Sequence, residues 1–156
     1  MSGFVTPNTP NVTDYTTFLQ TSVGIPVSAL PADSPWITYA FNQGLALTAQ
    51  VPTITPIVYV LAVYNCATHI QIKITPDQPA QMFFSTLRGA GEGGFNLVGV
   101  PTSVLSGSAD QGTSQAMAVP DSLKNLTLTD LDFMRTPWGR DWIQYGQDIG
   151  PLWGLA

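Results

Sequence analysis

The longest apolar stretch of the chain, residues 56–74 with the sequence PIVYVLAVYNCATHIQIKI, limits the possible folds more than any other feature. Thr55 and Pro56 are typical of a helix start, because threonine can cap free N–H groups and proline at the first helical position loses no hydrogen bond. Apolar residues recur at helical spacing, although the many β-branched residues would also suit a buried strand. Nineteen residues is long for a strand and ordinary for a helix, so we predict a core helix.

A membrane span is not expected from this stretch. Such a span needs about 18 or more uninterrupted apolar residues. Here Asn65, His69, Gln71 and Lys73 interrupt the apolar run. The N-terminal sequence MSGFVTPNTP has neither the basic nor the apolar region of a signal peptide, so secretion by that route is not expected either.

The chain carries unusually little charge. Lys, Arg, Asp and Glu make up 10% of its 156 residues, against about 25% in an ordinary soluble domain. Hydrophobic residues make up 44%, and such a chain is expected to cover much of its surface with other protein. The net charge of −5 argues against direct binding of nucleic acid, which needs Lys and Arg to displace counterions.

Length and pattern predict one domain with four parts. These are an extended N-terminal arm at 1–10, a helical bundle at 11–88, a loop or strand arm at 89–120, and C-terminal helices with a docking tail at 121–156. The predicted fold class is mainly α. A small helical bundle surrounds the long central helix, with an irregular or β-hairpin arm at about 95–120 and a C-terminal helix followed by an extended tail.

Signals for the start of a helix recur through the chain, each a capping residue followed by proline or aspartate. Gly24 is expected to end the first of these helices, and the second is expected to end before Pro52. The predicted starts are Thr13-Asp14, Ser34-Pro35, Thr75-Pro76-Asp77, Thr129-Asp130 and Thr136-Pro137.

Residues 95–120 have a different character. They are rich in Ser, Gly, Thr and Val, and they show no helical period. An irregular stretch of that length is unusual inside a compact domain. Two interpretations stay open at this point: a pair of strands, or an arm that a neighbouring chain orders.

Two motifs could indicate chemistry. Residues 89–94, GAGEGG, match the G-x-G-x-x-G pattern, but a dinucleotide site needs a strand before it and a helix after it, and here the order is wrong. Cys66 and His69 lie three residues apart on the core helix. A structural zinc site needs four ligands, and the chain has no other Cys or His. A Cys–His nucleophile pair would also need an oxyanion hole and an orienting group.

We therefore expect Cys66 to be a buried core residue and His69 to be a hydrogen-bonded one. Asp130 and Asp132 could be offered as an acid–base pair, but the first turn of a helix is an ordinary place for carboxylates. We predict no catalytic site, no metal and no cofactor, and we do not expect an enzyme.

The C-terminal region carries a set of aromatic residues. Trp138, Trp142 and Tyr145 fall on one face of the last predicted helix, and about half of this set is expected to pack inward. Leu152 and Trp153 lie in an apolar tail. Because Trp and Tyr often anchor interfaces, we expect the tail to meet a partner.

The middle and end of the chain carry a recognisable arrangement. Residues 98–100 and 106–114, VGV and SGSADQGTS, precede a helix start at 136–140 that reads TPWGR. The N-terminal half has a helix with SPWITYA followed by a long helix with LAVYNCATHI. Over about residues 12–147 the chain resembles the head–tail connector (adaptor) proteins of tailed bacteriophages.

The resemblance implies a structural virion protein of the neck, between capsid and tail, assembled in the host cytoplasm. It implies a homo-oligomeric ring, typically a dodecamer, which binds the portal protein and continues the DNA channel without binding DNA specifically. A tail or nozzle protein and neighbouring copies would be the further partners, and no membrane is involved. We assign portal docking to the C-terminal helix and tail, that is to Trp138, Trp142, Tyr145, Leu152 and Trp153. We assign contacts between subunits or with the tail to Phe95, Val98, Val100, Val104, Leu105, Asp110 and Thr113.

Two alternatives remain at this stage. The first is another virion protein, either one that completes the neck or tail or one that stabilises the capsid. The second is a small-molecule-binding or hydrolytic domain that uses Cys66 and His69.

Overall fold

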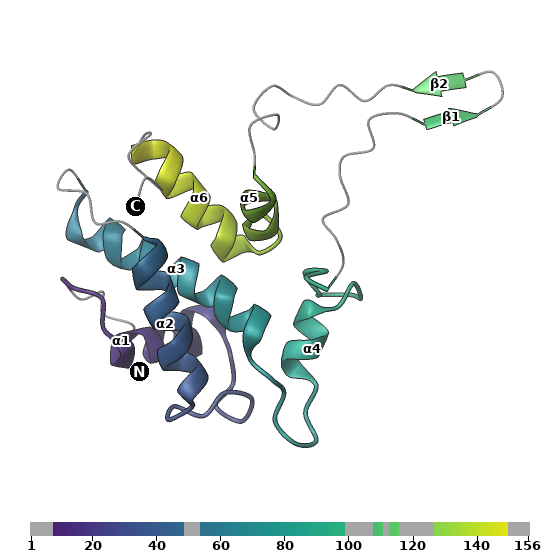
Figure 1. Cartoon of the computed structure of the whole chain (residues 1–156). Helices are drawn as coiled ribbons and strands as arrows, with labels where there is room; N and C mark the ends of the chain where they lie inside the picture. Colours follow the sequence, from purple (N-terminus) through teal and green to yellow (C-terminus); the bar gives the residue numbers. More distant parts are fainter. Residues whose placement is uncertain (1–7, 49–53, 99–107, 111–112, 116–126, 150–156) are drawn as a thin grey trace.

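The computed structural model describes residues 8–48, 54–98, 108–110, 113–115 and 127–149 (Figure 1). This part of the chain is mainly helical, and its helices form a small bundle around one long helix, as the sequence predicts. The elements are α1 (Val12–Phe18), η1 (Leu19–Val23), α2 (Pro35–Leu47), α3 (Pro56–Ile74), α4 (Phe83–Arg88), β1 (Ser108–Asp110), β2 (Thr113–Gln115), α5 (Leu128–Phe133) and α6 (Pro137–Ile149).

The long helix α3 has the predicted bounds, and it is buried along most of its length. By length and composition it could cross a membrane, with a mean hydropathy of 1.3, but 61% of that window is buried inside the protein. Helix α2 covers one side of α3, and α6 contacts another (Figure 1). Because α3 is apolar on most of its faces, several other elements must pack on it.

Aromatic rings join α1 and α2 to the centre of α3. The ring of Tyr64 lies 5.5 Å from Tyr15, 5.6 Å from Phe18 and 6.4 Å from Phe41, measured between centroids. The Tyr64 hydroxyl also donates to the carbonyl oxygen of Asn11 and accepts from its N–H, both at 3.2 Å. One α3 side chain therefore fixes the point where the chain enters α1.

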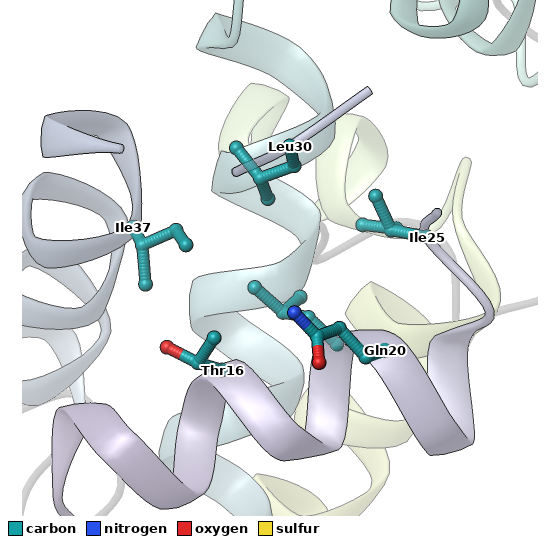
Figure 2. A pocket seen from close by; sticks show the side chains of 6 residues that line it. Thr16, Gln20, Ile25, Leu30 and Ile37 are labelled. Atoms are coloured by element: carbon teal, nitrogen blue, oxygen red, sulfur yellow. The ribbon is translucent and has the colours of Figure 1, made fainter. Parts of the chain in front are cut away.

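The space between α1, η1 and α2 is filled by aliphatic side chains. Figure 2 shows Ile25, Leu30 and Ile37 converging on it above the helix that carries Thr16 and Gln20. The remaining gap is too small to hold a water molecule. It is packed core and offers no site for a ligand.

Two predicted helix starts that follow α3 are wrong. Thr75 does not open α4; it is buried and ends α3, while α4 begins at Phe83. Asp77 still caps α4 from a distance, because its carboxylate accepts the N–H of Phe84 at 2.6 Å and that of Ser85 at 3.1 Å. The cap of α5 is Thr127, not Thr129, and it forms a capping box with Asp130.

The first two helices differ from the prediction in detail only. Asn11 and not the predicted Thr13 caps α1, since the Asn11 side chain accepts the N–H of Asp14 at 2.8 Å. Gly24 follows the helical turns at a φ of +80°, as expected for a glycine stop. Helix α2 ends at Leu47, before Pro52, and its N-cap Ser34 makes no side-chain capping bond.

Within the predicted arm, residues 108–110 and 113–115 form the two strands of a β-hairpin. Strands β1 and β2 pair antiparallel, with Ser108 opposite Gln115 and Asp110 opposite Thr113. The strand interpretation is therefore confirmed for 108–110 and 113–115. The rest of 99–126, the tail at 150–156 and the arm at 1–7 lie outside the described residues.

Gly44 sets how closely α2 approaches α3. A Cβ atom at this position would lie 2.8 Å from the carbonyl oxygen of Val63 and 2.8 Å from the Cβ of Ala67. Contacts that short require one helix to move, because a backbone oxygen is involved. The absence of a side chain at Gly44 is therefore a requirement of the fold.

We predict that Gly44→Ala destabilises the protein, although alanine favours helices by about 1 kcal/mol over glycine. Overpacking a close helix contact costs about 1–3 kcal/mol, and we expect it to exceed this gain. The measurement is the free energy of unfolding in urea. Gly91→Ala is the control, because a Cβ there meets nothing within 4 Å, and it should change stability by less than about 0.5 kcal/mol. Equal stability of the two variants would contradict the prediction.

Candidate functional site

The predicted docking helix α6 begins at a tight corner that follows α5. The hydroxyl of Thr136 accepts the N–H of Gly139 at 3.0 Å, which caps α6 as the Thr-Pro signal predicts. A side chain at Gly139 would overlap the carbonyl oxygen of Phe133. The Thr-Pro-Trp-Gly sequence therefore has a local structural role. Its threonine caps α6, and its glycine lets the end of α5 pack against α6.

The tryptophans of α6 lie partly inside the fold. The Trp142 ring lies 4.6 Å from that of Phe133, and its Nε1–H donates to the hydroxyl of Thr48 at 3.0 Å. The Trp138 ring meets the edge of Phe95 at 5.9 Å. Phe95 and Trp138, which the sequence assigned to two different interfaces, therefore pack against each other. Trp142 links α6 to the end of α2.

Of the other predicted interface residues, few have described surroundings. Tyr145 is half-buried, and burial, with a smaller contribution from Asp141, raises the pKa of its hydroxyl. Val98 is 81% exposed, and Asp110 pairs with Thr113 in the hairpin. The predicted residues that lie outside the described part of the chain are Val100, Val104, Leu105, Leu152 and Trp153.

The polar centre of this region is His69. Its ring is 1% exposed and stacks on Phe133 at 4.2 Å. Its Nδ1 lies 2.8 Å from the hydroxyl oxygen of Thr136, and its Nε2 lies 3.5 Å from a carboxylate oxygen of Asp132. Because a carboxylate can only accept, Nε2 carries the proton and Nδ1 accepts from Thr136. His69 thus ties both ends of the α5–α6 corner to α3.

Burial controls the protonation of this cluster. It lowers the pKa of His69 to about 4, although the nearby carboxylate of Asp132 acts in the opposite direction. Partial burial alone would raise the pKa of Asp132, but the hydrogen bond and charge of Lys73, together with His69, outweigh it and lower that pKa. At neutral pH the cluster therefore consists of a neutral imidazole beside an ion pair.

Thr136, His69 and Asp132 match the residue types of a hydrolytic triad, but their environment does not fit that chemistry. Thr136 is fully buried, and its oxygen already accepts a backbone N–H. Cys66 is also fully buried, and burial raises the pKa of its thiol to about 12. Among the described residues no group of three His, Cys, Asp or Glu side chains could hold a metal. The arrangement is suited to holding helices together.

Sequence reasoning assigned only part of this cluster. It expected a hydrogen-bonded His69 and a buried Cys66, and both are observed. It placed Asp132 in the first turn of a helix, whereas Asp132 binds Lys73 across 59 residues of sequence. No local signal indicates that contact, because it depends on how α5 lies against α3.

A cleft in the described surface lies away from this region. A cleft of about 390 Å³ runs between α1 and the start of α2, and hydroxyl groups, including those of Thr13, Thr16, Thr17 and Thr38, line much of it. None of the predicted site residues borders it.

Comparison with known proteins adds no relative. No protein-family model, no curated protein and no solved structure matches this chain.

We predict that the protein loses stability as the pH falls from about 6.5 to about 4. The unfolded chain binds a proton at His69 near pH 6.5, whereas the folded chain does so only near pH 4, so the unfolded state binds more protons in this window. The expected loss is about 3 kcal/mol in total. Urea unfolding at a series of pH values measures it. Because the chain has one histidine, His69→Asn should remove this slope, and an unchanged slope would contradict the assignment.

We also predict that Cys66 reacts slowly with a thiol reagent in the native protein. Only the thiolate is reactive, and the buried thiol has both a raised pKa and no access to solvent. Mass spectrometry over time follows the alkylation, with the urea-unfolded chain as the fast-reacting reference. A native rate equal to that of the unfolded chain would favour a reactive cysteine.

Proposed function

We propose that this chain is a head–tail adaptor of a tailed bacteriophage virion. In this role it forms a ring on the portal, extends the DNA channel and connects the capsid to the tail. The proposal begins from the resemblance of residues 12–147 to that family. It places the protein in the virion neck after assembly in the host cytoplasm.

The observation that carries the proposal is the scarcity of charge on the exposed surface. No Asp, Glu, Lys or Arg occurs between Asp33 and Lys73. Yet this stretch includes exposed large apolar side chains such as Trp36, Tyr39 and Ile57. Monomers seldom leave such a surface open to water, whereas a subunit surrounded by other proteins covers it.

The hairpin supports contacts with a neighbour. Within the described residues β1 and β2 form a sheet of two strands and no more. A two-stranded ribbon is marginally stable by itself, and its edges can take up a further strand from another chain. We assign this hairpin, together with the exposed Val98, to contacts between subunits or with the tail protein.

We still assign portal binding to the C-terminal helix and tail, but the role of Trp142 changes. Trp142 is engaged with Phe133 and Thr48, so its first role is to hold α6 in place. Docking then falls mainly to Tyr145, the open part of Trp138, and the tail residues Leu152 and Trp153. An acidic chain in the channel wall would let DNA pass without binding it, since like charges repel.

The two alternatives are distinguishable. A protein that completes the neck or tail, or stabilises the capsid, would share the charge-poor surface but would not bind portal rings. A hydrolytic domain gains little support, because Cys66 and Thr136 are buried and Cys66 has a raised pKa.

The decisive measurement is the mass of the purified chain, alone and mixed with portal rings, by native mass spectrometry. We predict attachment to the portal ring, as a ring or as monomers that close into one there. We predict that Trp153→Ala keeps the helical circular dichroism spectrum but loses this attachment, because an interface tryptophan commonly supplies much of the binding energy. Val27→Ala, at an exposed apolar position in the loop before α2, is the control.

A chain that ignores portal rings at every concentration would contradict the adaptor proposal. If Trp153→Ala still attached and yielded infectious particles, the tail would not be the docking element.

A further inference from the structure

The outer side of α2 carries an exposed surface to which the proposed function assigns no particular partner. Trp36, Tyr39, Gln43 and Ala46 follow one another at spacings of three, four and three residues. This is the a/d pattern of a helix that packs along a second helix. Yet these residues lie away from the inward face of α2, which consists of Ile37, Ala40, Phe41 and Gly44. We call these four outward residues, with the adjoining Leu47, the α2 stripe.

The α2 stripe is uncharged, and its large apolar side chains are exposed. Trp36 is 38% exposed, Tyr39 is 51% exposed and Leu47 is 47% exposed. The rings of Trp36 and Tyr39 meet edge to face at 6.4 Å, so the two aromatic side chains support each other in an outward position. A row of exposed side chains of this kind along one helix is suited to a helical partner; Figure 1 shows the position of α2 in the bundle.

The charge of the chain indicates which partner fits. A partner of opposite charge would bind to a charged face of this chain. Two copies of the chain, each with a net charge of −5, repel each other and therefore need a neutral face in order to associate. The α2 stripe provides one, because no charged residue lies between Asp33 and Lys73. The neutral stripe therefore fits a second copy of this chain.

The order of side chains along the stripe sets the orientation. The spacings of three, four and three are the same in both directions. A two-fold axis that crosses the stripe at the level of residue 41 therefore places Trp36 of one copy opposite Ala46 of the other. The same axis places Tyr39 opposite Gln43. Large side chains then face smaller or flexible ones, whereas a parallel pair would stack Trp36 on Trp36 and leave the Ala46 end loose.

We propose that two copies of this chain associate through antiparallel pairing of their α2 helices. Such a contact uses the same patch on both copies and closes on itself, so it cannot propagate around a ring. It therefore describes the free protein and does not depend on the adaptor role. A single pair of 13-residue helices forms a small interface, so the dimer is weak and its population depends on concentration.

The test is sedimentation equilibrium of the full chain, without portal, from micromolar to millimolar concentration. We expect a monomer–dimer equilibrium, and we expect Trp36→Arg to raise the dissociation constant at least about tenfold, as the loss of an interface tryptophan does. Val27→Arg is the matched control, since it adds the same charge at an exposed apolar site outside the stripe. Circular dichroism checks that both variants fold.

Disulfide trapping tests the orientation. Chains with Tyr39→Cys mixed with chains with Gln43→Cys should form a cross-linked heterodimer under mild oxidation, while neither variant alone should cross-link efficiently. The native Cys66 is buried and should not interfere. Rapid cross-linking of Tyr39→Cys alone would indicate a parallel pair and overturn the proposed orientation.

A chain that stays monomeric at every concentration would overturn the proposal itself. If, in addition, Trp36→Arg abolished binding to portal rings, the portal and not a second copy would be the partner of the α2 stripe. Because dimerisation is measured without portal, its failure leaves the adaptor proposal standing, and failure of portal binding leaves the dimer standing.

Discussion

The burial of α3 is the constraint on which the rest of the structure depends. A 19-residue helix that is apolar on most of its sides must be covered by several elements, and each contact uses a different chemistry. Gly44 lets α2 approach closely, and Tyr64 gathers the aromatic rings of α1 and α2. Arg88 of α4 donates to the carbonyl oxygens of Ile72 and Thr75, which would otherwise be free at the end of α3. His69 holds the α5–α6 corner.

Sequence patterns predict elements best where the determinant is local. The starts of α3 and α6 follow from a proline at the first helical position, and Thr136 also caps α6, whereas Thr55 makes no side-chain capping bond to α3. The predicted start of α4 is wrong because Asp77 lies six residues before the first helical residue and caps the helix from there. Spacing rules do not describe this geometry. The predicted cap of α5 is wrong because Thr127 and Thr129 are both suitable capping residues, and only the bond between Thr127 and Asp130 distinguishes them.

The candidate site shows the same division between local and distant determinants. The amphipathic pattern of α6 predicted that some of its aromatic residues would face inward, and Trp142 does. Its hydrogen bond to Thr48 joins residues 94 positions apart, and the contact of His69 with Thr136 joins residues 67 apart. Such pairs depend on how complete helices dock, which single-residue properties do not specify. The sequence alone could therefore name Trp142 and His69, but not their partners.

The positions of its polar and charged groups separate the surfaces of this charge-poor chain. Some of its polar groups bond inside the core, where the Thr68 hydroxyl donates to the carbonyl oxygen of Tyr64 and the Thr136 hydroxyl bonds to His69. Described charged groups such as Lys73, Arg88 and Asp132 lie at the C-terminal end of α3 or on α4 and α5. The α2 stripe belongs to a long uncharged stretch of the sequence, whereas the hairpin follows α4 in the chain and includes Asp110. Because the α2 stripe and the hairpin belong to different elements, the two contacts proposed for them use different residues of the chain.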